Sequence, residues 1–141
     1  MSVNTRSQKL SQKAFTCVEQ RKLKLGDEYG EYETVARKFP SLIHTCGLAQ
    51  AVAFAQAKRN AKKNEGGAEC RYLADLAAVL NAGDHTEFSD ANGLAGCTRR
   101  NGVTTYLRLS RDAIEAAIWL KRYAEALSDS DTPAPPTETK T

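Results

Sequence analysis

Alanine occurs 21 times in this chain of 141 residues, whereas the β-branched residues isoleucine and valine together occur nine times. Alanine is the best helix former, and β-branched residues favour strands. The length suits one domain, and the formal net charge is only +3. The composition therefore predicts an all-α fold, a compact bundle of about five to six helices.

Capping residues and glycines mark the expected helix ends. Thr5 followed by Gln8 has the spacing of a capping box, which predicts a first helix from about Thr5 to Lys24. Gly47 and Gly83 stand where C-terminal caps belong. The other expected helices span residues 31–38, 40–46, 48–62, 68–82 and 111–127.

Three local signals predict interruptions between these helices. The Phe39-Pro40 step should separate the second helix from the third, because proline disfavours helical backbone at the residue before it. Residues 83–102 carry four glycines, so we expect a long loop there, with room for one helical turn. Helical sequence resumes at Gly102, and Ser110 can cap the last helix.

The C-terminal segment, residues 128–141, contains three of the four prolines and no leucine, isoleucine, valine or aromatic residue. It cannot bury apolar surface, so residues 1–127 should form the helical bundle domain and residues 128–141 a disordered tail. No apolar run approaches the roughly 20 residues that span a bilayer, and the first ten residues lack the apolar segment of a signal peptide. We expect a soluble cytoplasmic protein with no membrane partner.

No catalytic or metal-binding motif is present. Cys17, Cys46, Cys70 and Cys97 form no C-x-x-C pair, and we interpret them as reduced and mostly buried. His85 lies in the polar stretch G-D-H-T-E-F-S-D, which is typical of a solvated loop. The sequence therefore predicts no catalytic residue, no metal site and no cofactor.

Positive charge is concentrated in the first part of the chain, where residues 1–63 carry a net charge of +7. Four cations of the first helix fall on a stripe about 60° wide and about 27 Å long. They are Arg6, Lys9, Lys13 and Lys24. Such a stripe could follow several phosphates of a nucleic acid. An ordinary solvated helix face has the same pattern, so spacing alone leaves both interpretations open.

On the last helix, Ile114 and Ile118 lie opposite the main apolar face, among charged residues. They would be exposed unless another surface covers them. Either they contact a partner, or they pack internally against residues 83–102.

Several short segments resemble a known family in their order and spacing. They are T-R-S-Q-K from Thr5, F-P-S-L-I-H-T-C-G-L-A-Q-A-V-A-F from Phe39, Y-L-R-L-S-R-D from Tyr106 and W-L-K-R-Y-A-E-A-L from Trp119. Together they resemble the small helical subunit of type III-B CRISPR effector complexes, the Cmr family, from Thr5 to Leu127.

The resemblance implies a helical bundle without a catalytic site, whose copies stack head to tail into a short filament. The expected partners are guide RNA and target RNA, the backbone and large subunits of a multi-subunit Cmr complex, and other copies of this chain. Base pairing supplies sequence recognition in RNA-guided complexes, so the protein needs cations that follow the RNA backbone.

The candidate site residues follow from this resemblance. RNA contact is expected first from Arg6, Lys9, Lys13 and Lys24, and second from Lys121 and Arg122. Ile114 and Ile118 are candidates for a subunit interface. We assign Pro40, Gly47, Phe54 and Trp119 to structure. The alternative function is a helical protein–protein adaptor whose basic face docks an acidic partner and does not bind RNA.

Overall fold

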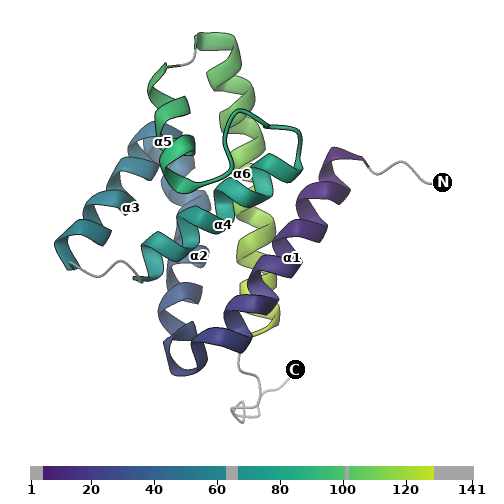
Figure 1. Ribbon diagram of the computed structural model, residues 1–141, viewed down its shortest axis with the longest axis vertical. Coiled ribbons are helices and arrows are strands. Elements are labelled where there is room, and N and C mark those ends of the chain that lie inside the picture. Colours follow the sequence, from purple (N-terminus) through teal and green to yellow (C-terminus); the bar gives the residue numbers. More distant parts are fainter. Residues whose placement is uncertain (1–4, 63–66, 101, 129–141) are drawn as a thin grey trace.

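The computed structural model describes residues 5–62, 67–100 and 102–128, and this part of the chain is helical (Figure 1). The elements are α1 (Arg6–Leu25), the short 3-10 helix η1 (Gly26–Glu28), α2 (Tyr29–Cys46), α3 (Leu48–Lys62), α4 (Ala68–Ala82), α5 (Ala91–Arg100) and α6 (Val103–Ala126). The described residues contain no strand, which confirms the predicted all-α class. The predicted tail lies outside the described residues beyond Ser128.

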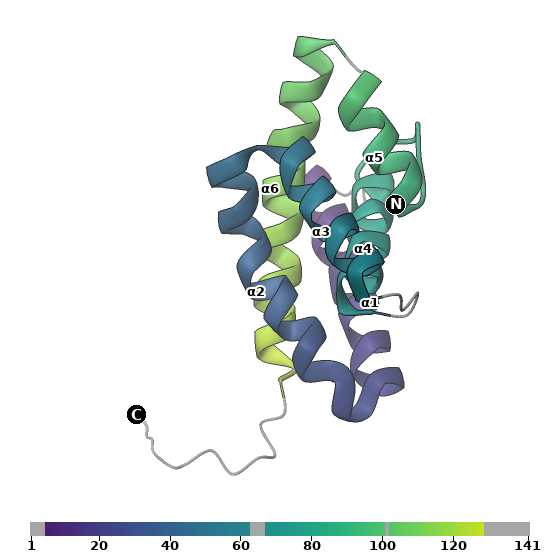
Figure 2. The ribbon, with the colours of Figure 1, turned by 90° about the vertical axis from the view of Figure 1, so that its left-hand side faces the viewer.

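Helix α4 is the centre of the bundle, because it contacts each of the other five α-helices in the described chain. The long helices α2 and α6 run side by side, and α1 packs against α4 and α6 (Figure 2). The predicted apolar face of α4 is buried as expected, at Tyr72, Leu73, Leu76, Val79 and Leu80. No described helix combines the length and the apolar character needed to cross a membrane.

The capping box of α1 forms as predicted. The Thr5 hydroxyl accepts a hydrogen bond from the Gln8 backbone N–H at 3.1 Å, and the Gln8 side chain accepts one from the Thr5 N–H at 2.8 Å. The helix ends before Gly26, whose φ of +56° favours glycine. Its buried face is the predicted stripe of Leu10, Ala14, Cys17 and Val18.

The predicted break at the Phe39-Pro40 step is wrong, since α2 continues through Pro40 to Cys46. A proline inside a helix removes one hydrogen bond and costs about 3 kcal/mol. Burial on both sides of Pro40 outweighs this cost, because each large apolar side chain that leaves water contributes about 1.5–3 kcal/mol. The buried residues Tyr32, Ala36, Phe39 and Ile43 lie on one face of the uninterrupted helix.

The prediction of a long loop over residues 83–102 is also wrong, because α5 occupies ten of these residues. Asp90 starts the helix by accepting a hydrogen bond from the Gly93 N–H at 2.7 Å. Glycine at position 93 reflects close packing, since a Cβ there would lie 2.6 Å from the Cβ of Phe88. Phe88 and Leu94 join the core, so burial stabilises a segment whose glycines lower helix propensity.

Ser110 does not cap the last helix, because α6 begins one residue after Gly102 and runs through Ser110. The N-terminal part of α6 is held by tertiary contacts: Leu109 is buried, and the Tyr106 hydroxyl accepts a hydrogen bond from the Ala49 N–H at 3.1 Å. The Ser110 hydroxyl is buried and has no hydrogen-bond partner among the described residues. A capping residue in the sequence was therefore misleading here.

Candidate nucleic-acid interface

The cations of the predicted basic stripe lie away from the buried face of α1, but two of them face acids of other elements. Lys9 Nζ lies 3.4 Å from Asp84 Oδ1, in the turn after α4. Arg6 Nη1 lies 3.5 Å from Asp112 Oδ1, on α6. Part of the charge in the N-terminal half of the stripe is therefore balanced within the chain.

The Lys9–Asp84 pair is exposed, with 39% of the lysine side chain and 69% of the aspartate side chain accessible. Exposed ion pairs contribute about 0–1 kcal/mol, because water and salt screen them. A phosphate can compete with such a pair, so Lys9 remains available to a nucleic acid.

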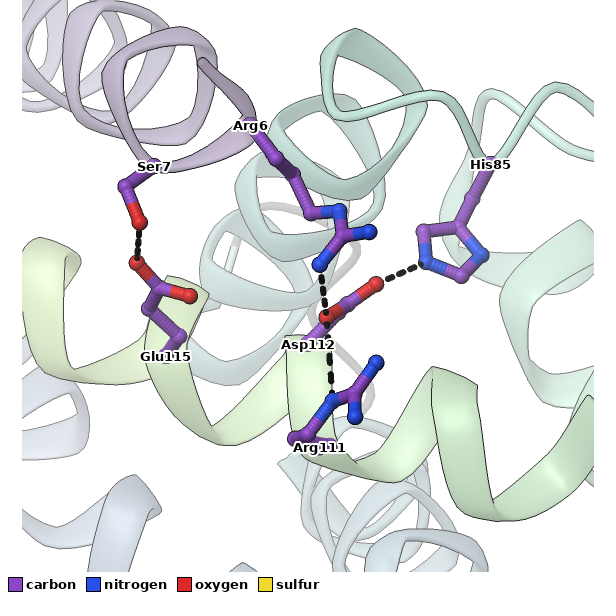
Figure 3. Close-up of polar contacts among 6 residues, drawn as sticks. All are labelled: Arg6, Ser7, His85, Arg111, Asp112 and Glu115. Atoms are coloured by element: carbon purple, nitrogen blue, oxygen red, sulfur yellow. Dashed lines mark hydrogen bonds and ion pairs between the residues drawn. The ribbon is translucent and has the colours of Figure 1, made fainter.

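The Arg6–Asp112 pair belongs to a buried cluster (Figure 3). The Asp112 side chain is 2% exposed; its Oδ2 lies 2.7 Å from His85 Nε2, and Arg111 Nε lies 3.8 Å from its Oδ1. A buried carboxylate is costly unless it is paired and hydrogen-bonded. The cluster ties the start of α1 and the turn after α4 to α6.

The expectation that His85 lies in a solvated loop is wrong, because His85 is buried and contacts Asp112. Its ring also stacks on Phe88, with ring planes 18° apart. The polar stretch around His85 indicates exposure, but the partner that buries it comes from α6. Sequence reasoning missed Asp112 as part of the site for the same reason.

Lys13 and Lys24 are exposed, and neither forms an ion pair within the described part of the chain. Lys13 and Lys9 line a shallow hollow of about 280 Å³ together with Gln12, Thr16 and Ala82. The hollow combines two ammonium groups with polar side chains, which suits phosphate and sugar oxygens. Lys9 and Lys13 are thus the stripe residues that the structure brings together.

A buried polar network fixes how α1 presents the stripe. Arg21 donates two hydrogen bonds to the Asp75 carboxylate, at 2.9 and 3.0 Å, and the Tyr32 hydroxyl donates to the same carboxylate. Burial raises the pKa of Cys17 to about 12, and the nearby negative charge of Asp75 adds to this effect. The network joins α1, α2 and α4, so the rotation of α1 about its axis is determined by tertiary contacts.

Lys121 and Arg122, the second candidates for RNA contact, lie on α6 and are half-buried and exposed, respectively. Helix α6 meets α1 near them through the Ser11–Tyr123 hydrogen bond of 2.7 Å and the edge-to-face contact of Phe15 with Tyr123. The stripe hollow, by contrast, lies beside Ala82 at the end of α4. The structure therefore does not merge the two groups of cations into one patch.

The cysteines do not form a metal site, since no group of three metal-ligating side chains lies together in the described residues. All four are free thiols, as predicted. The expectation that they are mostly buried holds for Cys17 and Cys97 only, because Cys70 is half-buried and Cys46 is exposed near the end of α2.

The sequence model of the CRISPR-associated protein family Cas_Cmr5 matches residues 6–127, which is the segment from α1 to the end of α6. The chain belongs to the Cmr5 family. This confirms the resemblance that the short sequence segments indicated.

Two relatives from Thermus thermophilus support the membership in the Cmr5 family. The protein described as CRISPR system Cmr subunit Cmr5 from this organism is 38% identical over 126 residues, which cover 89% of this chain and 97% of the relative. A crystal structure of a CRISPR-associated Cmr5 family protein from Thermus thermophilus matches with a TM-score of 0.73 and 37% identity, over 88% of this chain and 98% of that one.

On this Cmr5-family fold the isoleucine pair is only partly accessible. Ile114 packs against the core, and Ile118 is half-buried. The predicted role of the pair in a subunit interface stays a prediction.

Phe54, which we assigned to structure, is 52% exposed. It lines a groove between α2 and α3 that the sequence did not reveal, since the groove walls come from two helices.

Proposed function

We propose that this chain is a non-catalytic small subunit of an RNA-guided Cmr complex that contacts the RNA backbone through the basic stripe of α1. The observation that carries the proposal is membership in the Cmr5 family, whose matched range of residues 6–127 contains the whole stripe. The curated relative is described as a subunit of the Cmr system. The partners would be guide and target RNA, the backbone and large subunits, and further copies of this chain.

The electrostatics of the stripe support a backbone contact. Lys13 and Lys24 are exposed, and Lys9 is held only by an exposed acid. Base pairing reads the sequence in RNA-guided complexes, so cations along the phosphates suffice for the protein. The stripe carries no aromatic side chain, and aromatic platforms are typical of proteins that stack free single-stranded bases. Paired RNA therefore fits this surface better than unpaired RNA.

The buried His85–Asp112 contact is better explained by structure than by catalysis. The Asp112 carboxylate is shared with Arg6 and Arg111, and its side chain is 2% exposed. A general base must reach a substrate proton, which this carboxylate cannot do from its buried position. We accordingly propose no nuclease or other hydrolase activity for this chain.

Head-to-tail stacking of copies, which the family resemblance implies, requires two different surfaces on each subunit. Ile118 and its neighbour Ile114 are the sequence-based candidates for one of them. Replacing Ile118 by glutamate is expected to reduce incorporation into the complex without loss of helical circular dichroism, because this side chain is half-buried.

The salt dependence of RNA binding tests the proposed contact. Replacing Lys13 by alanine in the assembled complex should flatten the slope of log K against log salt by about 0.7–0.9, the contribution of one phosphate contact. Arg37→Ala is the matched control, since Arg37 is an exposed cation on α2 outside the stripe. The loss should be similar for unrelated paired sequences, because a backbone contact carries no base information.

Two outcomes would contradict the RNA contact. If Lys13→Ala leaves the salt slope unchanged in a folded, assembled complex, the stripe does not touch RNA and the adaptor function gains support. If Arg37→Ala has the same effect as Lys13→Ala, the response reflects net charge and not a contact of α1.

A further inference from the structure

A groove of about 460 Å³ opens on the face formed by α2 and α3. Its walls are largely apolar, with Val35, Phe39 and Leu42 from α2 and Phe54 and Ala55 from α3. More than half of the Phe54 side chain remains accessible to water. An apolar hollow of this kind gains stability when an apolar side chain fills it.

The groove also carries two cations. Lys38 of α2 and Lys58 of α3 are both exposed and line the groove, and Lys58 Nζ lies 5.5 Å from the centre of the Phe54 ring. A complementary surface would present an apolar side chain next to an acid. Another basic surface would be repelled.

Helix α1 carries such a surface, which we call the outer ridge: Phe15, Glu19 and Leu23. These residues are four apart, so they share one face of the helix. Leu23 is 79% exposed and Phe15 39%, and the acidic Glu19 between them is also exposed. The ridge thus combines exposed apolar side chains with one negative charge, the pattern that the groove requires.

The outer ridge and the groove lie on different sides of the molecule. Helices α1 and α3 lie on opposite sides of α4 in Figure 1. In Figure 2 the α2 and α3 side faces the viewer, with α1 farther back. One copy cannot bring its ridge to its own groove, but a second copy can.

We propose that the groove between α2 and α3 binds the outer ridge of a second copy of this chain, with Leu23 beside Phe54 and Glu19 facing Lys58 and Lys38. The contact joins two different surfaces, so each added copy leaves a free ridge and a free groove. This inference rests on the proposed stacking and names the two surfaces that carry it. It does not depend on the RNA contact, because Lys13 and Lys24 are not part of the ridge.

Cross-linking between cysteine variants tests the contact. Leu23→Cys and Phe54→Cys are introduced separately into a chain that also carries Cys46→Ser and Cys70→Ser, the replacements of the two cysteines that are not buried. A short bismaleimide should link the two variants to each other when they are mixed in the assembled complex. Either variant alone should give no linked pair, and a chain with both cysteines should give a ladder. Leu107→Cys, at another exposed leucine, is the matched control for Leu23→Cys and should not link to Phe54→Cys.

A charge exchange provides a second test that leaves the apolar residues unchanged. Glu19→Lys alone and Lys58→Glu alone should each reduce the cross-linked fraction about two- to fivefold, as expected for an exposed ion pair. The chain with both substitutions should recover most of the cross-link, because the charges are opposite again.

Three cross-linking results would each overturn the inference: Leu23→Cys linked to itself, Phe54→Cys linked to a different subunit, or no product from the mixture in an assembled complex. If Ile118→Glu abolishes self-association while the charge exchange has no effect, the stacking survives and only these two surfaces are rejected. Failure of the cross-link also leaves the salt-slope result for Lys13 intact, so the two proposals are tested separately.

Discussion

The guanidinium of Arg6 lies 3.5 Å from the carboxylate of Asp112, at the junction of α1 and α6. Helical spacing places Arg6 in the basic stripe, but the structure gives it a buried acid as partner. Asp112 also contacts His85 and Arg111, so its charge is shared among three basic side chains. We therefore expect Arg6 to stabilise the fold and to contribute less to RNA binding than Lys13.

Replacing Asp112 by asparagine should lower the free energy of unfolding by about 2–3 kcal/mol, because a buried carboxylate with charged partners is lost. Asp84→Asn is the matched control; its side chain is exposed, and the expected cost is at most about 0.5 kcal/mol. Urea unfolding followed by circular dichroism measures both. Equal, small effects would show that the Asp112 cluster does not hold α1 to α6.

The same Asp84→Asn variant should bind RNA more tightly in the assembled complex. The substitution frees Lys9 and removes a negative charge beside the stripe, so the slope of log K against log salt should steepen by about 0.7–0.9. Glu87→Gln removes one exposed negative charge three residues later and serves as the control. If both variants change the slope equally, Lys9 has no specific role in the contact.

The four thiols should react with iodoacetamide in the order of their exposure. At pH 8 Cys46 should react first and Cys17 should be protected, because burial raises the Cys17 pKa to about 12 and the thiolate is the reactive form. Mass spectrometry of the alkylated peptides measures the order, and all four should react in urea. Rapid alkylation of Cys17 in the folded protein would contradict the buried network around Asp75.

Alkaline pH should destabilise the fold through its buried tyrosines. Burial and the neighbouring Asp75 charge raise the pKa of Tyr32 above its ordinary value of 10, and burial raises the pKa of Tyr72 in the same direction. The folded state therefore keeps protons that the unfolded state releases above about pH 10, so this stability is present below pH 10 and is lost as the pH rises further.

Urea midpoints at pH 8, 9, 10 and 11 test this dependence. Tyr32→Phe should be less stable than the wild type at pH 8, because the hydrogen bond to Asp75 is lost, but its midpoint should fall less steeply with pH. A variant with the same pH dependence as the wild type would show that Tyr32 does not titrate on unfolding.

The family signal and the local helix ends could be predicted from the sequence. Thr5, Gln8, Gly47 and Gly83 act on backbone groups a few residues away, so their effect can be deduced from spacing. The predicted bounds of α1, α3 and α4 agree closely with the structure for this reason. Local signals failed at Pro40, where buried side chains on both sides outweigh the cost of one proline.

The sequence by itself determined the helical class and the alignment of the stripe cations along α1, because both follow from residue preferences and the period of a helix. Only the tertiary structure decided which of these cations stay available. Asp84 and Asp112 reach Lys9 and Arg6 from segments far away in the chain, and Phe39 and Phe54 form one groove from two helices. Ion pairs and cavities depend on distances in space, and those distances arise from how the helices pack around α4.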